Sequence, residues 1–107
     1  MSQSEPEIFK PLDPILQNPL RLALVNLLAQ GSWLPFGELK EKTGASPGNL
    51  SSQIGKLKTA GYVEVNKQFR DNYPQTRVRL TEKGKTAFLQ YAECMLTYLQ
   101  AGTSLSK

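Results

Sequence analysis

The spacing of hydrophobic residues changes at Gly61, and that change constrains the fold more than any other feature. Before Gly61, apolar residues such as Leu50, Ile54 and Leu57 recur every three or four positions, which is the period of an amphipathic helix. In residues 63–66 apolar and polar residues alternate, which is the period of a strand. The sequence therefore predicts helices first and a small sheet after them.

Capping signals divide the first part of the chain into helices. Asn18 precedes Pro19 and Ser46 precedes Pro47, and each pair combines a capping side chain with a proline suited to the first helical position. Gly44 and Gly61 are plausible stops. The predicted helices span 18–31, 35–43 and 46–61, with a very short extended segment at 33–34 and a tight turn at 44–45.

Two alternating segments follow, at 63–66 and 77–80, and the turn-rich, charged segment 69–75 lies between them. They predict a β-hairpin. Thr81 is expected to cap a last helix over 82–100. The order helix, short strand, helix, helix, hairpin, helix is an α+β fold, mainly α, with winged helix-turn-helix topology. We expect an N-terminal arm at 1–13, one domain at 14–100 and a polar tail at 101–107.

The composition argues against catalysis and metal binding. The chain has no histidine and one cysteine, Cys94, which removes the common metal sites and the Ser-His and Cys-His nucleophile pairs. We therefore expect no enzyme activity and no cofactor. Cys94 is interpreted as an inert small hydrophobe, with a redox role as the alternative. No apolar stretch approaches the roughly 20 residues of a membrane span, and the N-terminus shows no secretory signal, so a cytoplasmic location is expected.

The basic charge is concentrated in one third of the chain. Residues 56–85 hold eight Lys and Arg against three acidic residues, whereas residues 32–55 are neutral and residues 1–31 are slightly acidic. A local excess of this kind indicates a polyanionic partner at that end of the molecule.

Two motifs resemble a known family. Residues 46–63 read SPGNLSSQIGKLKTAGYV, and residues 77–84 read RVRLTEKG. They resemble the third helix and the strand-to-helix junction of MarR/ArsR-like winged helix-turn-helix transcriptional regulators, most similarly the short single-domain "winged helix DNA-binding domain" subgroup. With Asn18-Pro19-Leu20-Arg21, the match spans roughly 14–99. The resemblance implies a dimeric regulator whose third helix enters the major groove of double-stranded DNA while the wing contacts flanking backbone or minor groove. Gln53 replaces a His common in the subgroup, so base preference is not transferred.

The side of the third helix opposite Leu50 is small and polar. Asn49 and Gln53 are the candidate base readers, because their amides can pair with adenine edges. Ser46 is a helix cap that can also contact phosphate, and Gly55 indicates close approach either to DNA or to a neighbouring element. The expected DNA contacts on this helix are Ser46, Gly48, Asn49, Ser51, Ser52, Gln53 and Lys56.

The hairpin supplies the second group of expected DNA contacts, because an arginine at a wing tip can enter a minor groove. A merely solvated basic face is the alternative. We expect Phe69 to anchor the wing base in the core. The expected wing contacts are Arg70, Asn72, Tyr73, Gln75 and Arg77, with Arg79 on the same outward strand face.

The first and last helices carry more apolar residues than one core stripe needs, which predicts a homodimer seam and a near-palindromic DNA site. A small-molecule effector, of unknown identity, could bind between these helices and the DNA-reading core. The alternative function is a winged-helix protein-protein interaction module without DNA binding. The expected interface residues are Leu22, Val25, Phe88, Tyr91, Met95, Tyr98 and Leu99.

Overall fold

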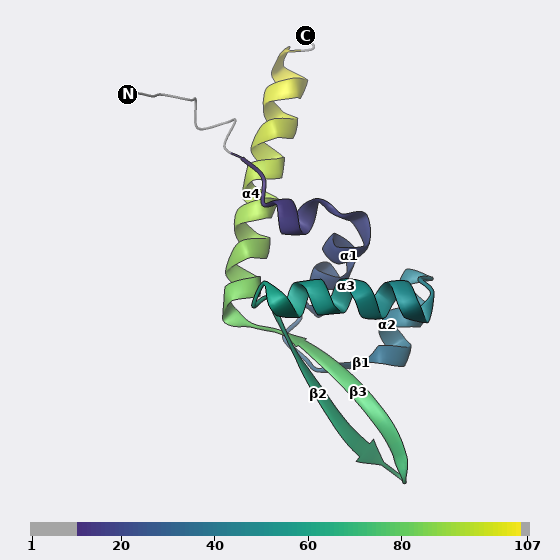
Figure 1. The fold of residues 1–107 in the computed structure, drawn as a ribbon. Coiled ribbons are helices and arrows are strands. Elements are labelled where there is room, and N and C mark those ends of the chain that lie inside the picture. Colours follow the sequence, from purple (N-terminus) through teal and green to yellow (C-terminus); the bar gives the residue numbers. More distant parts are fainter. Residues whose placement is uncertain (1–10, 106–107) are drawn as a thin grey trace.

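The structure, a computed structural model, describes residues 11–105 (Figure 1). Helices α1, α2 and α3 lie together beside the lower half of α4, and the β2–β3 hairpin projects away from them. This arrangement confirms the predicted winged helix-turn-helix fold. The elements in chain order are the 3₁₀ helix η2 (Pro14–Gln17), α1 (Pro19–Leu28), β1 (Leu34–Pro35), α2 (Phe36–Thr43), α3 (Pro47–Thr59), β2 (Val63–Arg70), β3 (Tyr73–Leu80) and α4 (Glu82–Leu105).

The capping residues read from the sequence begin the helices as expected. The Asn18 side chain accepts a hydrogen bond from the Arg21 N–H at 3.0 Å, and Ser46 Oγ accepts one from the Asn49 N–H at 3.2 Å. Thr81 Oγ1 accepts the Gly84 N–H at 3.0 Å. Each bond satisfies a backbone donor that a helix start would otherwise leave unpaired.

The three strands form an antiparallel sheet in the order β1-β3-β2. The hairpin register runs from Val63 opposite Leu80 to Arg70 opposite Tyr73, so only Asp71 and Asn72 form the turn. Both adopt positive φ, as a two-residue hairpin turn requires, and Asp and Asn tolerate that conformation better than most residues. The predicted loop at 69–75 is therefore wrong: most of that segment extends the strands.

The core lies where the three short helices meet the sheet and α4. Val25 is completely buried there and Tyr91 is 7% exposed. The prediction that these two residues belong to a dimer seam is wrong, because both already pack inside their own chain. The buried hydrophobic residues are Leu16, Leu24, Val25, Leu28, Leu39, Leu50, Ile54, Leu57, Tyr62, Val63, Val78, Leu80 and Tyr91.

Both ends of the domain differ from the prediction. Residues 1–10 of the predicted arm lie outside the described residues, but Leu12 packs on the core and Asp13 caps η2, whose Leu16 is fully buried. At the other end α4 continues through Gly102 to Leu105 instead of ending at Gln100. One glycine costs a helix only about 1 kcal/mol, and no proline follows it. Residues 106–107 of the predicted tail are not described.

No helix within residues 11–105 has both the length and the apolar character needed to cross a membrane.

Candidate nucleic-acid interface

One side of α3 is open to solvent along its whole length. Leu50, Ile54 and Leu57 turn inward and are buried. The opposite side is small and polar, and no acidic residue lies on this helix. The residues predicted to contact DNA that are exposed on α3 are Ser46, Gly48, Asn49, Ser51, Ser52 and Lys56, together with Gly55.

The structure decides between the two interpretations of Gly55. A Cβ built at Gly55 would have no heavy atom within 4 Å, apart from its chain neighbours and its own helix. Within residues 11–105, packing on a neighbouring element is therefore excluded as the reason for a glycine here. The position instead keeps the exposed side of α3 flat.

Gln53 is half-buried at the border between α3 and α1 rather than fully exposed. Its Oε1 accepts a hydrogen bond from Arg21 Nη1 at 2.7 Å, and its Nε2 donates to Asn49 Oδ1 at 3.3 Å. Arg21 also donates from Nε to the carbonyl oxygen of Ile15 at 2.7 Å. Of the two predicted base readers, only Asn49 is exposed, and both belong to one hydrogen-bonded row.

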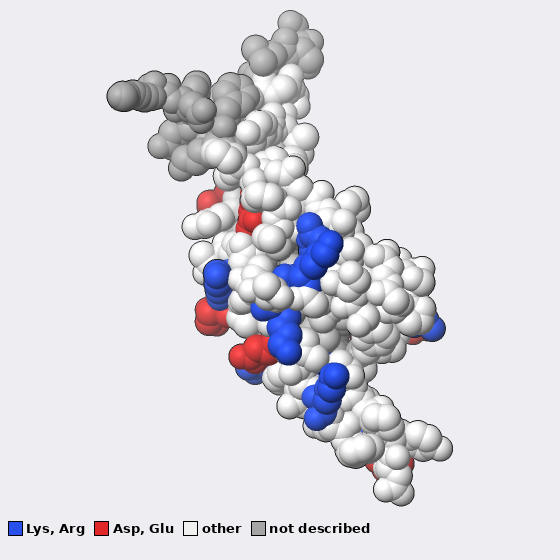
Figure 2. All heavy atoms as spheres, viewed as in Figure 1, with Lys and Arg blue, Asp and Glu red and all other residues white. Residues whose placement is uncertain are grey.

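Basic side chains gather beside the C-terminal half of α3. Figure 2 shows a band of Lys and Arg that crosses α3 and continues onto the base of the wing, while the N-terminal half of α3 is uncharged. Lys56 and Lys58 are exposed on the last turns of the helix. The local field on this side of the molecule therefore favours a polyanion.

The wing has two different faces, because neighbouring side chains of a strand point to opposite sides of the sheet. Val63, Val65, Lys67 and Phe69 share the face that packs against the helices near the core. Phe69 is 77% exposed close to the turn, so its predicted role as an anchor at the wing base is wrong. Lys67 is an exposed cation on this face and is not among the predicted DNA contacts, although the alternation from Val63 places it there.

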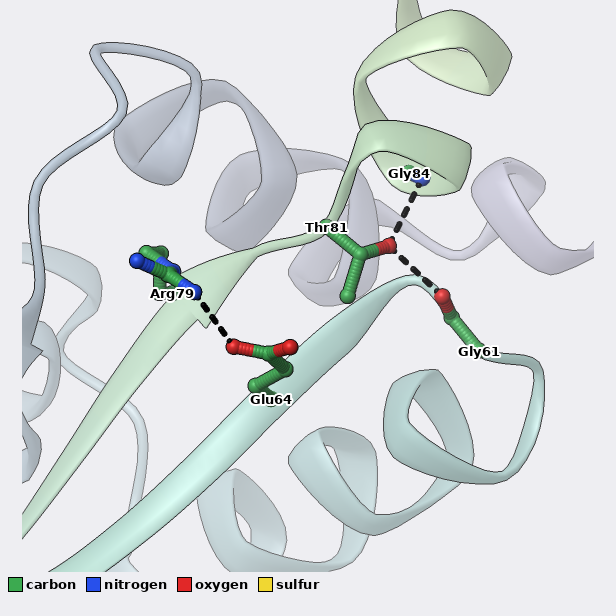
Figure 3. A network of polar contacts seen from close by, with 5 residues as sticks. All are labelled: Gly61, Glu64, Arg79, Thr81 and Gly84. Carbon is green, nitrogen blue, oxygen red and sulfur yellow. Dashed lines mark hydrogen bonds and ion pairs between the residues drawn. The ribbon is translucent and has the colours of Figure 1, made fainter.

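The opposite face of the sheet carries Arg77 and Arg79 on β3. Both guanidinium groups lie over the ring of Trp33, at 5.1 and 4.7 Å from its centroid. Arg79 Nη2 also pairs with Glu64 Oε1 at 2.7 Å (Figure 3). Gln75 lies on the same face and is half-buried. Arg77 thus stacks on the protein's own tryptophan, and the DNA contacts of Gln75 and Arg77 stay predictions.

The remaining predicted DNA contacts of the wing lie at its tip. Arg70, Asn72 and Tyr73 are all exposed, Tyr73 to 75%. Arg70 and Tyr73 flank the two-residue turn that Asn72 forms with the acidic Asp71. The tip thus combines one cation with an amide and an aromatic ring.

A compact junction fixes the wing relative to α3 and α4. Gly61 adopts a φ of +83°, and the Tyr62 N–H donates to the Leu57 carbonyl at 2.9 Å, which ends α3 in a Schellman motif. Thr81 Oγ1 donates to the Gly61 carbonyl at 2.6 Å while accepting from Gly84 (Figure 3). The two ends of the hairpin are therefore joined to each other and to the start of α4.

The Tyr62 side chain connects this junction to the segment before α1. Its hydroxyl donates a hydrogen bond to the Asp13 carboxylate. Burial, together with this hydrogen bond and the negative charge of Asp13, raises the pKa of Tyr62 to about 12. The tyrosine therefore remains neutral far above physiological pH.

A second surface consists of apolar residues on α4 and α1. Leu22, Phe88 and Met95 line a groove of about 480 Å³ between the two helices. Next to it, Leu89 and Leu96 are each 56% exposed. Of the other predicted interface residues, Leu99 is exposed and Tyr98 is half-buried.

Within residues 11–105, no group of three or more cysteine or acidic side chains is arranged to hold a metal ion.

The fold and the open α3 face are those of a winged helix-turn-helix nucleic-acid-binding domain. Residues 20–99 match the family model described as winged helix DNA-binding domain, and the chain belongs to that family. An uncharacterized protein of Methanocaldococcus jannaschii is 32% identical over 77 residues, which cover 72% of this chain and 84% of that protein. The biofilm growth-associated repressor of Xylella fastidiosa is 40% identical over 67 residues, 63% of this chain. The matched segment spans about half, 54%, of that repressor.

Solved structures give the same result. A transcriptional regulator homologue from Pyrococcus horikoshii aligns with a TM-score of 0.79 and 29% identity, over 89% of this chain and 92% of that chain. The transcriptional repressor BigR from Xylella fastidiosa aligns with a TM-score of 0.60 and 32% identity, over 71% of each chain. MarR from E. coli shares the fold at a TM-score of 0.62 and 22% identity, over 78% of this chain and 64% of that chain. The family match and these neighbours place this chain among winged helix DNA-binding proteins.

Proposed function

We propose that this chain is a cytoplasmic transcriptional regulator that binds duplex DNA as a homodimer, with α3 in the major groove and the wing on the flanking backbone or minor groove. The observation that carries the proposal is the open side of α3, which is polar, flat at Gly55 and without acidic residues. A surface of this kind can approach base edges and phosphates without charge repulsion.

The polar residues divide into two roles. Asn49 lies where α3 would meet base edges, and Ser46 is at the helix N-terminus, whose partial positive charge favours phosphate. Ser51 and Ser52 follow in the second turn. Lys56 and Lys67 supply phosphate contacts from the helix and from the wing. Such contacts position the protein on any duplex, whereas base contacts select the sequence.

The spacing of apolar residues along α4 supports the homodimer. Leu89, Ala92, Leu96 and Leu99 follow one another at three- and four-residue steps and are all exposed. This is the a/d pattern of a two-helix seam, and a second copy of the same helix would bury it. The predicted residues Leu22, Phe88 and Met95 flank the seam, so we retain them as its margin. Repressors such as BigR among the neighbours agree with a regulatory role.

DNA binding measured against salt concentration tests the proposal. Fragments selected from genomic DNA by the wild-type protein serve as ligand. Each phosphate contact contributes about 0.9 to the slope of log affinity against log salt. Lys56→Ala and Lys67→Ala are each expected to weaken binding to all sequences and to reduce the slope by about that amount.

Lys85→Ala is the matched control, because it removes one charge from the side of the sheet where Glu64 and Arg79 lie. It should leave affinity and slope within experimental error of the wild type. If no duplex is bound at low salt, or if Lys56→Ala and Lys67→Ala behave like Lys85→Ala, the DNA interface is wrong, and a winged-helix protein-interaction module becomes the better interpretation.

A further inference from the structure

Arg21 lies on α1, yet it donates a hydrogen bond to a side chain of α3. Its Nε donates to the Ile15 carbonyl and its Nη1 donates to Gln53 Oε1, both at 2.7 Å. The two bonds hold the half-buried guanidinium in one orientation. Gln53 Nε2 then donates to Asn49 Oδ1 at 3.3 Å, which extends the row onto the exposed surface.

The orientation of the two amide groups in this row follows from which of their atoms can donate and which can accept hydrogen bonds. A guanidinium has N–H donors and no acceptor, so the oxygen of the Gln53 amide must face Arg21. The Gln53 nitrogen is thereby turned toward Asn49, and the Asn49 oxygen accepts from it. In the described part of the chain, Asn49 Nδ2 has no hydrogen-bond partner. The row therefore offers free N–H groups on two neighbouring amide nitrogens, those of Asn49 and Gln53.

We propose that Arg21 is a positioning residue that sets base preference by fixing the Gln53–Asn49 row in this orientation. The inference rests on the DNA-binding function proposed above. The amide nitrogens of Asn49 and Gln53 each keep a free N–H, whereas adenine offers one acceptor, N7, and one donor, N6, in the major groove. Guanine offers two acceptors, O6 and N7, in the major groove. The base opposite Asn49 is accordingly guanine in preference to adenine.

The experiment compares base preference between variants, by selection from a randomised duplex library followed by affinity measurements on single-base variants of the selected site. The wild type should select guanine at one or two positions per half-site, with about tenfold weaker binding when adenine replaces it. Arg21→Met removes the donor that orients Gln53, and this difference between guanine and adenine should shrink at those positions alone.

Arg21→Lys is the matched control. Lysine also has donors and no acceptor, so it still requires the Gln53 oxygen to face it. This variant should keep the wild-type order of bases even if overall affinity falls. A purely structural role for Arg21 would instead lower affinity for every sequence alike and leave the order of bases unchanged in both variants.

Gln53→Met covers the case in which Arg21→Met fails to fold, which thermal unfolding would reveal. It keeps the bond from Arg21 to Ile15 but removes the second amide donor and leaves the Asn49 amide free to turn, so adenine should now be accepted opposite Asn49. The inference is overturned if the wild type selects adenine there, or if Gln53→Met and any folded Arg21→Met keep the guanine preference unchanged. Failure of the wild type to select any sequence would instead reject the proposed function, and this inference with it.

Discussion

The first turn of α4 approaches the end of the α3–β2 junction so closely that a Cβ on Gly84 would lie 2.2 Å from the carbonyl oxygen of Tyr62. That carbonyl also accepts the Thr81 N–H at 2.9 Å, so it cannot move away without losing a bond. Gly84→Ala should therefore lower the free energy of unfolding by about 1–3 kcal/mol, the usual cost of overpacking. Urea denaturation monitored by circular dichroism measures it, and an unchanged midpoint would contradict the close approach.

Gly55, in contrast to Gly84, has open space where a Cβ would lie. Alanine there meets no other element, and replacing a mid-helix glycine should raise the free energy of unfolding by about 1 kcal/mol. The added methyl group lies on the proposed DNA side, so affinity for duplex should fall at the same time. Gly102→Ala, on α4, is the control: its Cβ also meets nothing within 4 Å, and it should leave DNA affinity unchanged. A Gly55→Ala protein with wild-type affinity would show that DNA does not approach this position.

The raised pKa of Tyr62 predicts a pH dependence of stability. Folding raises this pKa from 10.0 to about 12, because burial and the Asp13 carboxylate disfavour the tyrosinate. The stability that this difference contributes is fully present below pH 10 and is lost as pH rises toward 12. Urea midpoints measured across this range should fall less steeply for Tyr62→Phe than for the wild type. Tyr73→Phe, at the exposed wing tip, should follow the wild-type curve; identical curves for all three proteins would refute the assignment.

The apolar stripe on α4 predicts the effect of a charge on assembly. Burying a leucine is worth about 2 kcal/mol, so Leu96→Glu removes about 4 kcal/mol from a symmetric dimer and weakens it roughly a thousandfold. Sedimentation velocity should show a dimer for the wild type and a monomer for Leu96→Glu at the same micromolar concentration. Gln90→Glu places the same charge on another side of α4 and should remain dimeric. A wild-type monomer, or a dimeric Leu96→Glu, would remove the proposed seam.

Local signals were sufficient to predict most of the fold. Asn18, Ser46 and Thr81 act on neighbouring backbone groups, so their capping role is readable within a few residues of sequence. The alternation from Val63 similarly identified the start of the wing. The length of the wing was misjudged because charged and turn-forming residues outnumber apolar ones there, and only the pairing with β3 shows that Phe69 and Pro74 still face each other in the ladder.

The candidate site was less predictable, because its details depend on contacts between distant residues. Gln53 and Arg21 are 32 positions apart, and Arg77 stacks on Trp33 through the pairing of Pro35 with Arg77. The spacing of apolar residues along the sequence does not indicate which distant residues form such pairs. The buried state of Val25 was missed for a similar reason, since η2 and α4 both cover α1 and only the assembled domain shows how much of that helix they enclose.

The bonds of Thr81 to Gly61 and Gly84 have a consequence for any pair of these molecules. The hairpin and the long C-terminal helix are joined where they meet and should rotate together as one rigid body. In a dimer joined along α4, the crossing angle of the two long helices would then set the distance between the two wing tips. The separation of the half-sites on an operator would be governed by leucines that never come near the nucleic acid.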